Sequence, residues 1–471
     1  MHVMPRASAR ITRFTPVVGL STRASVAAAL RQTIVASPTR VDHPAAHSHP
    51  TTIALRSLWS QGDHRHPCVV SDIPNERSHT VKKLSTVGAL SLGVVLLATT
   101  AACSSNSSSS DSTNGSWKIG LEAPLSGSQS TLGQGMLQGA LLAADQLNAA
   151  GGVLGKKIEI VQIDDAADPT TGVAAANSAI AKGLNGVVGP YNSSVGAQTL
   201  PLYVKAGVVP IRLTSDNSTD GMGFTLQPMT SQIAPVTANA LSKFYKARSV
   251  GIIYDSSQNY TKSTSAAVKK ELEQSGVKIT SYQAITPGQS SYTTTLQQVQ
   301  AKNPDMIYSA VYYPEGAKIA QEITPKTPGT SAYRCLLDYA SYDSGYIQDA
   351  GASVAPRCNV VGVPAPSDFQ GSAPHVAAFQ NQFSQAPGTW SPYTFDSVNF
   401  LVDGAKSVGN FNYAPLTTAL STVKDWQGWT GKVTIESKTG NREPATVVVT
   451  AVTDGAFHVN SAWAQAVGAP Y

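Results

Sequence analysis

Seven loops rich in small polar residues and tyrosine carry the side chains of this sequence that could bind a small molecule. Each loop follows a short apolar segment: APLSGSQSTLGQG, DDAADP, GPYNSS, RLTSDNS, YDSSQNY, VYYPEG and LLDYAS. Serine and threonine hydroxyls, together with backbone amides at helix N-termini, suit an anion such as a carboxylate. Tyrosine supplies an apolar wall with a polar tip. These loops therefore predict a binding site for a small polar molecule.

Patterns that would indicate catalysis, a metal or a cofactor are weak by comparison. The sequence shows no Gly-x-Ser-x-Gly motif, no Walker loop and no serine with a plausible histidine partner, and only His375 and His458 follow residue 103. Gly133, Gly135 and Gly139 approach the dinucleotide fingerprint, but the third glycine comes one residue late. We expect no catalytic residue, no metal site and no cofactor, and we interpret these glycines as packing and turn positions.

Two series of alternating strand and helix patterns must position the loops. The first series begins at Trp117 and the second at Ser249. This alternation predicts an α/β fold with two Rossmann-like parallel-sheet lobes, in which ligands bind beyond the carboxyl ends of the strands. Two later helical patterns, at residues 372–386 and 395–408, have no strands of their own, so we expect them to return to the first lobe.

The chain should cross between the lobes several times. We predict one lobe from residues 117–228 plus 364–443 and the other from residues 229–363 plus 444–471. Several crossovers make a hinge with a cleft between the lobes. We place the hinge near residues 226–231, 361–367 and 443–447.

Residues 81–102 have the pattern of a secretory signal peptide. Lys82 and Lys83 precede an apolar run that is short for a membrane span and that ends in small residues before Cys103. This pattern resembles the lipobox of bacterial lipoproteins, whose cysteine is acylated and becomes the first residue after cleavage. The serine-rich residues 103–116 would form a flexible tether. We expect an exported protein, anchored by lipid at Cys103 to the outer face of the bacterial cell membrane.

The first 80 residues differ in composition from the rest. They contain nine arginines, no lysine and seven of the nine histidines. We expect that translation begins at Val81 from a GTG codon; the alternative is a disordered or targeting extension. Of 34 basic and 29 acidic residues, 11 and 4 precede Cys103, which leaves 23 and 25 and a net charge of about −2. The basic balance of the whole chain therefore does not indicate a nucleic-acid partner, and we expect none.

Two cysteines remain once Cys68 and Cys103 are set aside. Cys335 and Cys358 each lie beside an apolar strand pattern. Because disulfides persist in exported proteins, we predict a bond between them. Two buried free thiols are the alternative.

From residue 103 the sequence resembles, nearly end to end, the substrate-binding proteins of branched-chain amino acid ABC transporters. The residues that carry the resemblance are PLSGSQSTLGQGMLQGALLAADQLNAAGGVLGKKIEIVQIDDAADP, VVGPYNSSV, DMIYSAVYYPEGAKIA and YTFDSVNFLVDGAK. The resemblance implies the type I periplasmic-binding fold, a monomer without enzymatic activity, and delivery of a ligand to the transmembrane subunits of a permease. The ligand class implied is an amino acid. The alternatives are a sensor or receptor for an amide, urea or small carboxylate on the same fold, and an exported enzyme.

The resemblance also implies a pocket. The matching positions are Leu132, Tyr191, Asn192, Ser193, Thr214, Asp216, Tyr260, Tyr312, Asp338 and Tyr339. Ser193 would hold the ligand carboxylate, Tyr312 would face its ammonium, and Tyr260 would cover it. Thr214 would contact the ligand through its backbone, and Leu132 would take the place of an aromatic lid residue.

The anion that would pair a ligand ammonium stays open between two aspartates. Tyr339 occupies the aligned position, and Asp338 precedes it by one residue. Since a buried ammonium needs an anion, either Asp338 or Asp216 supplies it, or the ligand carries no ammonium.

Overall fold

The computed structural model describes residues 115–323 and 334–469. The predicted signal peptide, Cys68, the lipidation at Cys103 and most of the tether lie outside these residues. Within them, no helix is both long enough and apolar enough to cross a membrane.

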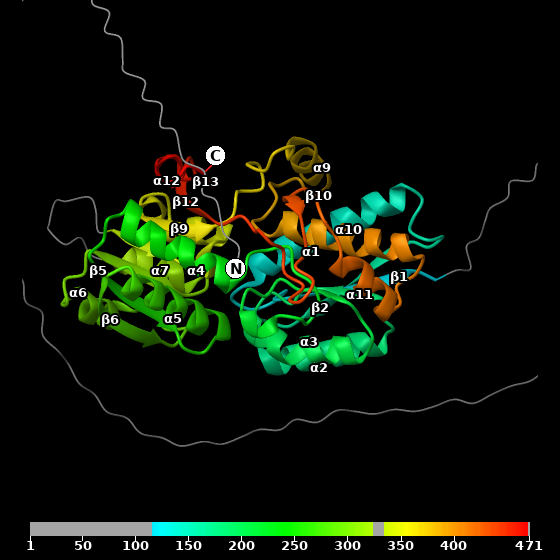
Figure 1. The fold of residues 1–471 in the computed structure, drawn as a ribbon, viewed down its shortest axis with the longest axis horizontal. Helices are drawn as coiled ribbons and strands as arrows, with labels where there is room; N and C mark the ends of the chain where they lie inside the picture. Colours follow the sequence, from blue (N-terminus) through cyan, green and yellow to red (C-terminus); the bar gives the residue numbers. More distant parts are fainter. Residues whose placement is uncertain (1–114, 324–333, 470–471) are drawn as a thin grey trace, which may run out of the picture. The chain divides into compact units, whose positions relative to one another are not determined.

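The first lobe is built on a four-stranded parallel sheet. Its strands, in the spatial order β2-β1-β3-β4, are β1 (Trp117–Ala123), β2 (Ile158–Asp164), β3 (Gly186–Val188) and β4 (Pro210–Ile211). The connecting helices are α1 (Ser130–Ala149), α2 (Pro169–Ala181) and α3 (Ser193–Lys205). In Figure 1, α2 and α3 lie on the opposite side of this sheet from α1, which agrees with the predicted α/β alternation.

The late helices return to the first lobe, as expected. The two expected helices are α9 (Ala373–Phe383) and α10 (Ser391–Val408). A helix that the sequence patterns did not reveal, α11 (Tyr413–Ser421), and a hairpin of β10 (Trp426–Gly428) and β11 (Gly431–Val433) follow them. Helix α10 starts before the predicted residue 395 because Pro392 in its first turn has the backbone conformation that begins a helix. It packs along α1, and Figure 1 shows the two side by side.

Glycines of α1 allow this close packing. Ser391 Oγ donates to Gly135 O at 2.7 Å, and Thr394 Oγ1 donates to Met136 O at 2.8 Å. A side chain at Gly139 would collide with the Ser391 carbonyl, and one at Gly133 would collide with the Pro124 carbonyl. The packing interpretation of these glycines is therefore consistent with the structure, and the sequence signal for a dinucleotide has an explanation in helix packing.

The second lobe is built on a seven-stranded mixed sheet. Its spatial order is β13-β12-β9-β8-β7-β5-β6, formed by β5 (Ser249–Asp255), β6 (Lys278–Ile285), β7 (Met306–Ala310), β8 (Cys335–Leu337), β9 (Cys358–Gly362), β12 (Val448–Thr453) and β13 (Ala456–Val459). Strands β5 to β9 are parallel, whereas β12 runs antiparallel to both of its neighbours. The fold class was predicted correctly, and the residue bounds of the two lobes stay a prediction.

Six α-helices among the described residues belong to this second part. They are α4 (Thr230–Asn239), α5 (Asn259–Gln274), α6 (Thr293–Gln300), α7 (Glu315–Glu322), α8 (Ser344–Ala350) and α12 (Ser461–Val467). The sequence patterns revealed α5, α6 and α7 only. Helices α8 and α12 span seven residues each, which is too short for a clear helical period, and Pro235 interrupts the pattern of α4.

The predicted disulfide is present in the second sheet. Cys335 opens β8 and Cys358 opens β9, and the two residues are direct partners in the parallel register. Their Cα atoms are 4.8 Å apart, and both side chains are buried. The bond ties neighbouring strands directly below the loop that carries Asp338.

Candidate functional site

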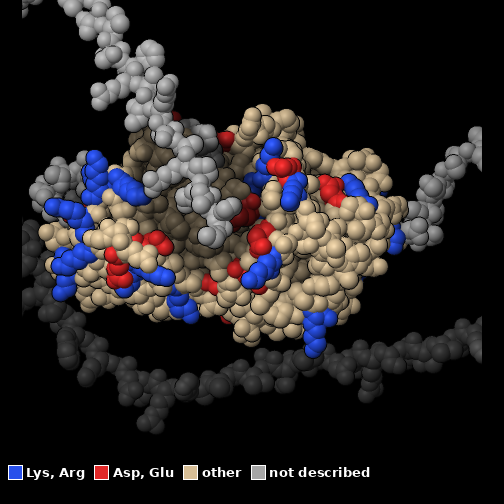
Figure 2. Space-filling view, in the orientation of Figure 1, with Lys and Arg blue, Asp and Glu red and all other residues tan. Residues whose placement is uncertain are grey.

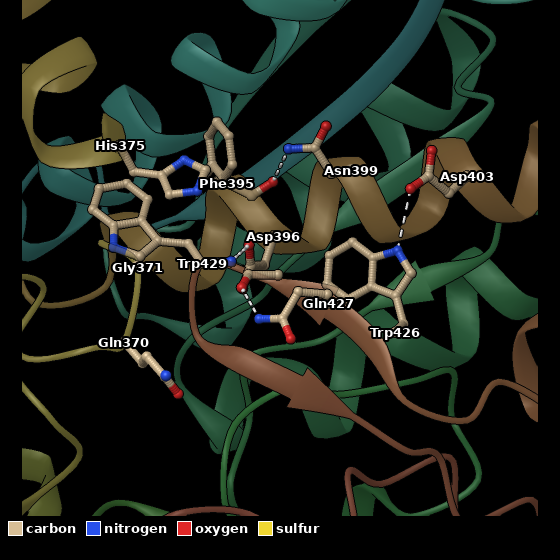
Figure 3. Close-up of a pocket in the computed structure, with 11 residues that line it drawn as sticks. Gln370, Gly371, His375, Phe395, Asp396, Asn399, Asp403, Trp426, Gln427 and Trp429 are labelled. Carbon is tan, nitrogen blue, oxygen red and sulfur yellow. Dashed lines mark hydrogen bonds between the residues drawn. The ribbon is translucent and has the colours of Figure 1, made fainter. Parts of the chain in front are cut away.

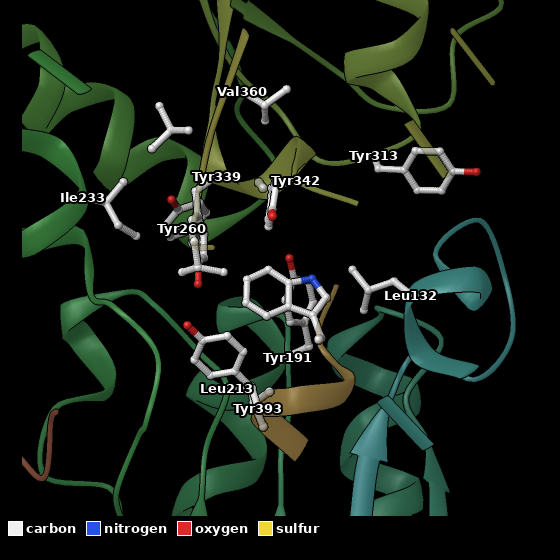
Figure 4. Close-up of a cluster of buried hydrophobic side chains, with 14 of the residues drawn as sticks. Leu132, Tyr191, Leu213, Ile233, Tyr260, Tyr313, Tyr339, Tyr342, Val360 and Tyr393 are labelled. Carbon is white, nitrogen blue, oxygen red and sulfur yellow. The ribbon is translucent and has the colours of Figure 1, made fainter. Parts of the chain in front are cut away.

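Aromatic side chains from both lobes meet where the strands end. Tyr191 follows β3, Tyr312 follows β7, Tyr339 follows β8, and Tyr260 lies in the first turn of α5. Trp390, which precedes α10, joins them. Figure 4 shows side chains of this group, with Leu132 of α1 directed toward the same cluster. Parallel strands bring their carboxyl-terminal loops to one edge of a sheet, and here the two edges face each other.

The rings form one connected cluster across the two lobes. Tyr312 stands edge-on to Tyr191 with centroids 6.0 Å apart and to Tyr260 with centroids 6.2 Å apart. Trp390 lies 5.4 Å from Tyr191 and 5.1 Å from Tyr339. Edge-to-face packing at these distances is favourable for aromatic rings, so the cluster holds the lobes together as well as lining the site.

A small cavity lies within this cluster. Its volume is about 10 Å³, and its walls are Tyr191, Leu213, Ser215, Gln227, Tyr260, Tyr312, Tyr339 and Ala340. That space is about what one water molecule requires. The structure therefore has the two lobes closed on each other at this point.

Several polar atoms around the cavity are buried without a hydrogen-bond partner among the described residues. They include Gln227 Oε1, the Tyr339 hydroxyl and Trp390 Nε1. Most buried polar groups in proteins are hydrogen-bonded, because leaving one unpaired costs about 1–3 kcal/mol. Unpaired groups gathered at one place therefore mark a position where a polar ligand would be stabilised.

The start of α3 forms one side of the site. Ser193 is the first residue of this helix, and its Oγ accepts a hydrogen bond from the Asp216 backbone nitrogen at 3.2 Å. Asn192 precedes the helix, and its Nδ2 donates to Gln129 Oε1 at 3.1 Å. The amides at a helix N-terminus and the positive end of its dipole favour an anion. This corner suits a carboxylate.

Thr214 and Asp216 lie in the loop beside that corner. Thr214 Oγ1 is 2.8 Å from Thr219 Oγ1, so its side chain is used within the loop. Asp216 Oδ1 accepts from the Ser218 nitrogen at 2.8 Å, and Oδ2 accepts from the Ser263 hydroxyl. Ser263 belongs to α5 of the second lobe. Asp216 thus bridges the lobes, and both of its oxygens are occupied.

Asp338 lies on the opposite side, in the second lobe. It follows β8 and is fully buried; its Oδ2 accepts from the Tyr308 hydroxyl at 2.6 Å and its Oδ1 from the Ala340 nitrogen at 3.1 Å. Burial raises the pKa of Asp338, and the hydrogen bonds from Tyr308 and Ala340 oppose that rise. Within the described residues it forms no ion pair. Like Asp216, it therefore has both oxygens hydrogen-bonded and no ion-pair partner among the described residues.

The structure buries all of the predicted site residues, but only some of them line the cavity. All ten are buried, with exposed fractions of 5% or less. Tyr191, Tyr260, Tyr312 and Tyr339 line the cavity itself. Leu132, Asn192, Ser193, Thr214, Asp216 and Asp338 are not among the residues that line it. A ligand in the cavity could contact these residues only if the cavity became wider.

Sequence reasoning missed four residues of this region. Trp390 and Gln227 contribute unpaired polar atoms, the Ser263 hydroxyl donates to Asp216 Oδ2, and Ser194 Oγ accepts from the Asn259 nitrogen of α5 at 2.8 Å. Two signals existed: Gln227 is a polar residue within the apolar stretch LQPM, and Trp390 lies directly before the Ser-Pro pair in the first turn of α10.

The face of the molecule in Figure 2 shows basic and acidic side chains interspersed on a mostly uncharged surface. Mixed charge of this kind is typical of a solvated surface. Among the described residues, no group of three or more histidine, cysteine or acidic side chains is arranged to hold a metal ion.

Comparison with known proteins identifies the family. The family model described as "Periplasmic binding protein" matches residues 116–456. A Leu/Ile/Val-binding protein of Rhizobium johnstonii is 32% identical over 210 residues, which are 44% of this chain and 57% of that protein, so the aligned segment spans little more than half of this relative. A Leu/Ile/Val-binding protein homologue of Brucella abortus is 26% identical over 329 residues, which are 68% of this chain and 86% of that protein.

Solved structures show the same fold. A leucine-binding protein of Thermotoga maritima superimposes with a TM-score of 0.67 at 20% identity, covering 73% of this chain and 97% of that one. A solute-binding protein of Rhodopseudomonas palustris, solved with 3,4-dihydroxybenzoic acid, gives a TM-score of 0.65 at 18% identity, covering 73% and 95%. With its two α/β lobes and its match to the family model over most of its length, the chain belongs to the periplasmic binding protein family and has the type I fold.

Proposed function

We propose that this chain is an exported solute-binding protein that captures an α-amino acid in the cleft between its lobes and delivers it to an ABC permease. Membership of the periplasmic binding protein family and the similarity to Leu/Ile/Val-binding proteins support a binding role rather than an enzymatic one. We further propose that the protein acts as a monomer and is held at the membrane by a lipid on Cys103.

The observation that carries the amino-acid proposal is the pairing of two opposite polar environments across one aromatic cluster. The N-terminus of α3 with Ser193 favours a carboxylate, and Asp338 is a buried carboxylate without an ion-pair partner among the described residues. A zwitterion would place its carboxylate at the first and its ammonium at the second. Each charge would then be compensated, which a closed, desolvated cleft requires.

Ligand entry requires the lobes to separate. A cavity of about 10 Å³ has no room for an amino acid. We propose that the lobes move apart by bending at the predicted crossovers near residues 226–231, 361–367 and 443–447, and that they close again over the ligand. Opening would break two hydrogen bonds between the lobes, one between Ser263 and Asp216 and one between Asn259 and Ser194.

An aromatic carboxylic acid is the second candidate ligand, and a specific observation favours it. The cluster contains at least five aromatic rings, and two structural neighbours of Rhodopseudomonas palustris were solved with 3,4-dihydroxybenzoic acid and with benzoate. Such a ligand would stack among the rings with its carboxylate at Ser193. It would leave Asp338 without a cation.

A thermal-shift screen separates the two candidates. The protein is heated with each of the twenty amino acids, with small amides including urea, and with benzoate and its hydroxylated derivatives. A ligand at ~100 times its dissociation constant stabilises the folded state by about 2.7 kcal/mol. Stabilisation by an amino acid, and not by the aromatic acids, supports the proposal. Stabilisation by aromatic acids or amides alone would reassign the ligand.

A further inference from the structure

A second pocket lies on the first lobe, outside the cleft. Three separate segments form it: residues 370–371 with His375 of α9, one face of α10, and strand β10 with Trp429 directly after it (Figure 3). Its volume is about 450 Å³, which falls within the roughly 300–1,000 Å³ of small-molecule sites. None of the residues that line it also lines the cavity in the cleft.

Aromatic rings form the walls of this pocket. His375 stacks on Trp429 with centroids 5.1 Å apart and planes 16° apart, and Phe395 stands edge-on to both. Trp429 is held in place because its Nε1 donates to Pro366 O at 3.1 Å. Trp426, which is partly exposed, donates from Nε1 to Asp403 Oδ2 at 3.1 Å. The pocket therefore has aromatic surfaces in fixed orientations.

A glycine keeps one of these surfaces in position. A side chain at Gly428 would collide with the Asp396 carboxylate and with the Trp426 ring. Only glycine lets the hairpin approach α10 closely enough to set Trp426 beside the pocket.

Planar polar side chains complete the lining. Asn399 and Asp403 lie four residues apart on α10, Gln370 lies in the loop before α9, and Gln427 lies in β10. Asn399 Nδ2 donates to Phe395 O at 3.0 Å, which fixes the orientation of its amide. Amide groups both donate and accept hydrogen bonds, which matches the two-way bonding of a hydroxyl group.

The charges of the pocket argue against an ionic ligand. No lysine or arginine is among its described lining residues, and two aspartates are, so an anion would be repelled. Burial lowers the pKa of His375, which keeps its ring neutral near pH 7.

Both aspartate carboxylates of the pocket already have partners within the protein, which disfavours a cationic ligand. Asp396 accepts from the Trp429 and Thr430 backbone nitrogens at 2.7 and 2.8 Å, and Asp403 accepts from Trp426 and lies 3.3 Å from Lys406 Nζ. A neutral ligand with several hydroxyl groups is left as the best match.

We propose that this pocket is a second binding site, which takes a neutral saccharide unit. The face of a sugar ring that carries C–H bonds would lie on Trp426, because the π face of an indole is electron-rich and the C–H bonds are weakly positive. The hydroxyl groups would bond to the amides of Asn399 and Gln427. This site lies apart from the amino-acid cleft, so neither proposal depends on the other.

Calorimetric titration of the full chain tests the site. The probes are glucose, galactose, mannose, N-acetylglucosamine, cellobiose and maltose, with choline and arginine as cationic comparisons. We expect saturable binding of at least one sugar. Trp426→Ala should weaken it at least about tenfold, a loss of ~1.4 kcal/mol, and Asn399→Ala should weaken it several-fold.

Asn177→Ala is the matched control. Asn177 is an exposed helical asparagine whose Nδ2 donates to the Val173 carbonyl, four residues earlier, at 2.9 Å, as Asn399 does to Phe395. Its replacement should leave sugar binding unchanged. If Trp426→Ala does not fold, Asn399→Ala and Gln427→Ala decide the question.

Three outcomes would overturn the saccharide site. The first is no saturable binding of any of the six sugars. The second is sugar binding that none of the pocket variants weakens. The third is binding of choline or arginine that Trp426→Ala abolishes, which would make the pocket a cation site.

Discussion

Replacement of Asp338 by asparagine should separate ligand binding from folding. In the closed structure Asp338 accepts hydrogen bonds from the Tyr308 hydroxyl and the Ala340 nitrogen. Asparagine has nearly the same shape, and its oxygen can keep the bond from Ala340 while Tyr308 accepts from the new amide. The substitution also removes a buried carboxylate whose pKa burial raises. We therefore expect the Asp338→Asn protein to be at least as stable as the wild type at pH 7.

Ligand affinity should change in the opposite direction. If the ligand ammonium pairs with Asp338, the substitution leaves that charge buried without an anion. Breaking a buried charge pair in this way costs about 3–5 kcal/mol. At ~1.4 kcal/mol for each factor of ten, the dissociation constant should rise at least about a hundredfold.

Calorimetry with a pair of ligands makes the test specific. The first ligand is the amino acid that gives the largest thermal shift, and the second is its 2-hydroxy acid, which lacks the ammonium. Asp338→Asn should weaken binding of the amino acid strongly and binding of the hydroxy acid little. Asp165→Asn is the matched control, because Asp165 is a buried carboxylate of the first lobe and is not among the residues that line the cavity. Equal affinity of wild type and Asp338→Asn for the amino acid would refute the reasoning.

Four further predictions concern the remaining parts of the account. Ser193→Ala should weaken amino-acid binding by about 1 kcal/mol through one lost hydrogen bond, as measured by calorimetry; no change would remove Ser193 from the site. Joint replacement of Cys335 and Cys358 by alanine should lower the free energy of unfolding by about 2–4 kcal/mol in urea titrations, and an unchanged midpoint would count against a structural disulfide. Burial raises the pKa of Asp165 to about 7, so the folded state binds the proton more tightly than the unfolded state. The free energy of unfolding should therefore fall as pH rises from about 4 to 7. Asp165→Asn should flatten that decline, and identical pH profiles of wild type and variant would contradict the prediction. Cys103→Ala should release the protein from membranes or block its processing, since buried acyl chains contribute ~0.8 kcal/mol per methylene; normal cleavage with unchanged membrane attachment would rule out lipidation.

The repeating parts of the fold were visible in the sequence, and the reasons are local. Each parallel strand of either lobe is an apolar segment followed by a polar loop, and the position of a loop at the carboxyl end of a strand follows from the alternation alone. The loops that carry Tyr191, Tyr312 and Tyr339 could be placed at the edge of a sheet for that reason, whereas the individual residues were named from the resemblance to the family. The pairing of Cys335 with Cys358 followed in the same way, because the two residues open successive strands.

The parts that were missed depend on contacts between distant segments. Trp390 reaches the cleft only because α10 packs on α1, which places a residue far along the chain beside Tyr191. The role of Asp216 as a bridge requires Ser263 of the other lobe. Strand β4 is only two residues long, and on its outer side the Arg212 nitrogen bonds to Phe224 O of a later segment. No pattern within one segment contains this information.

A crystal structure of the protein with the amino acid that gives the largest thermal shift tests the central claim most directly. We predict that the ligand lies between the lobes with its carboxylate at Ser193 and the N-terminus of α3, its ammonium toward Asp338, and Tyr191, Tyr260, Tyr312 and Tyr339 around it. A ligand bound outside this aromatic cluster, or one whose ammonium points away from Asp338, would contradict the account.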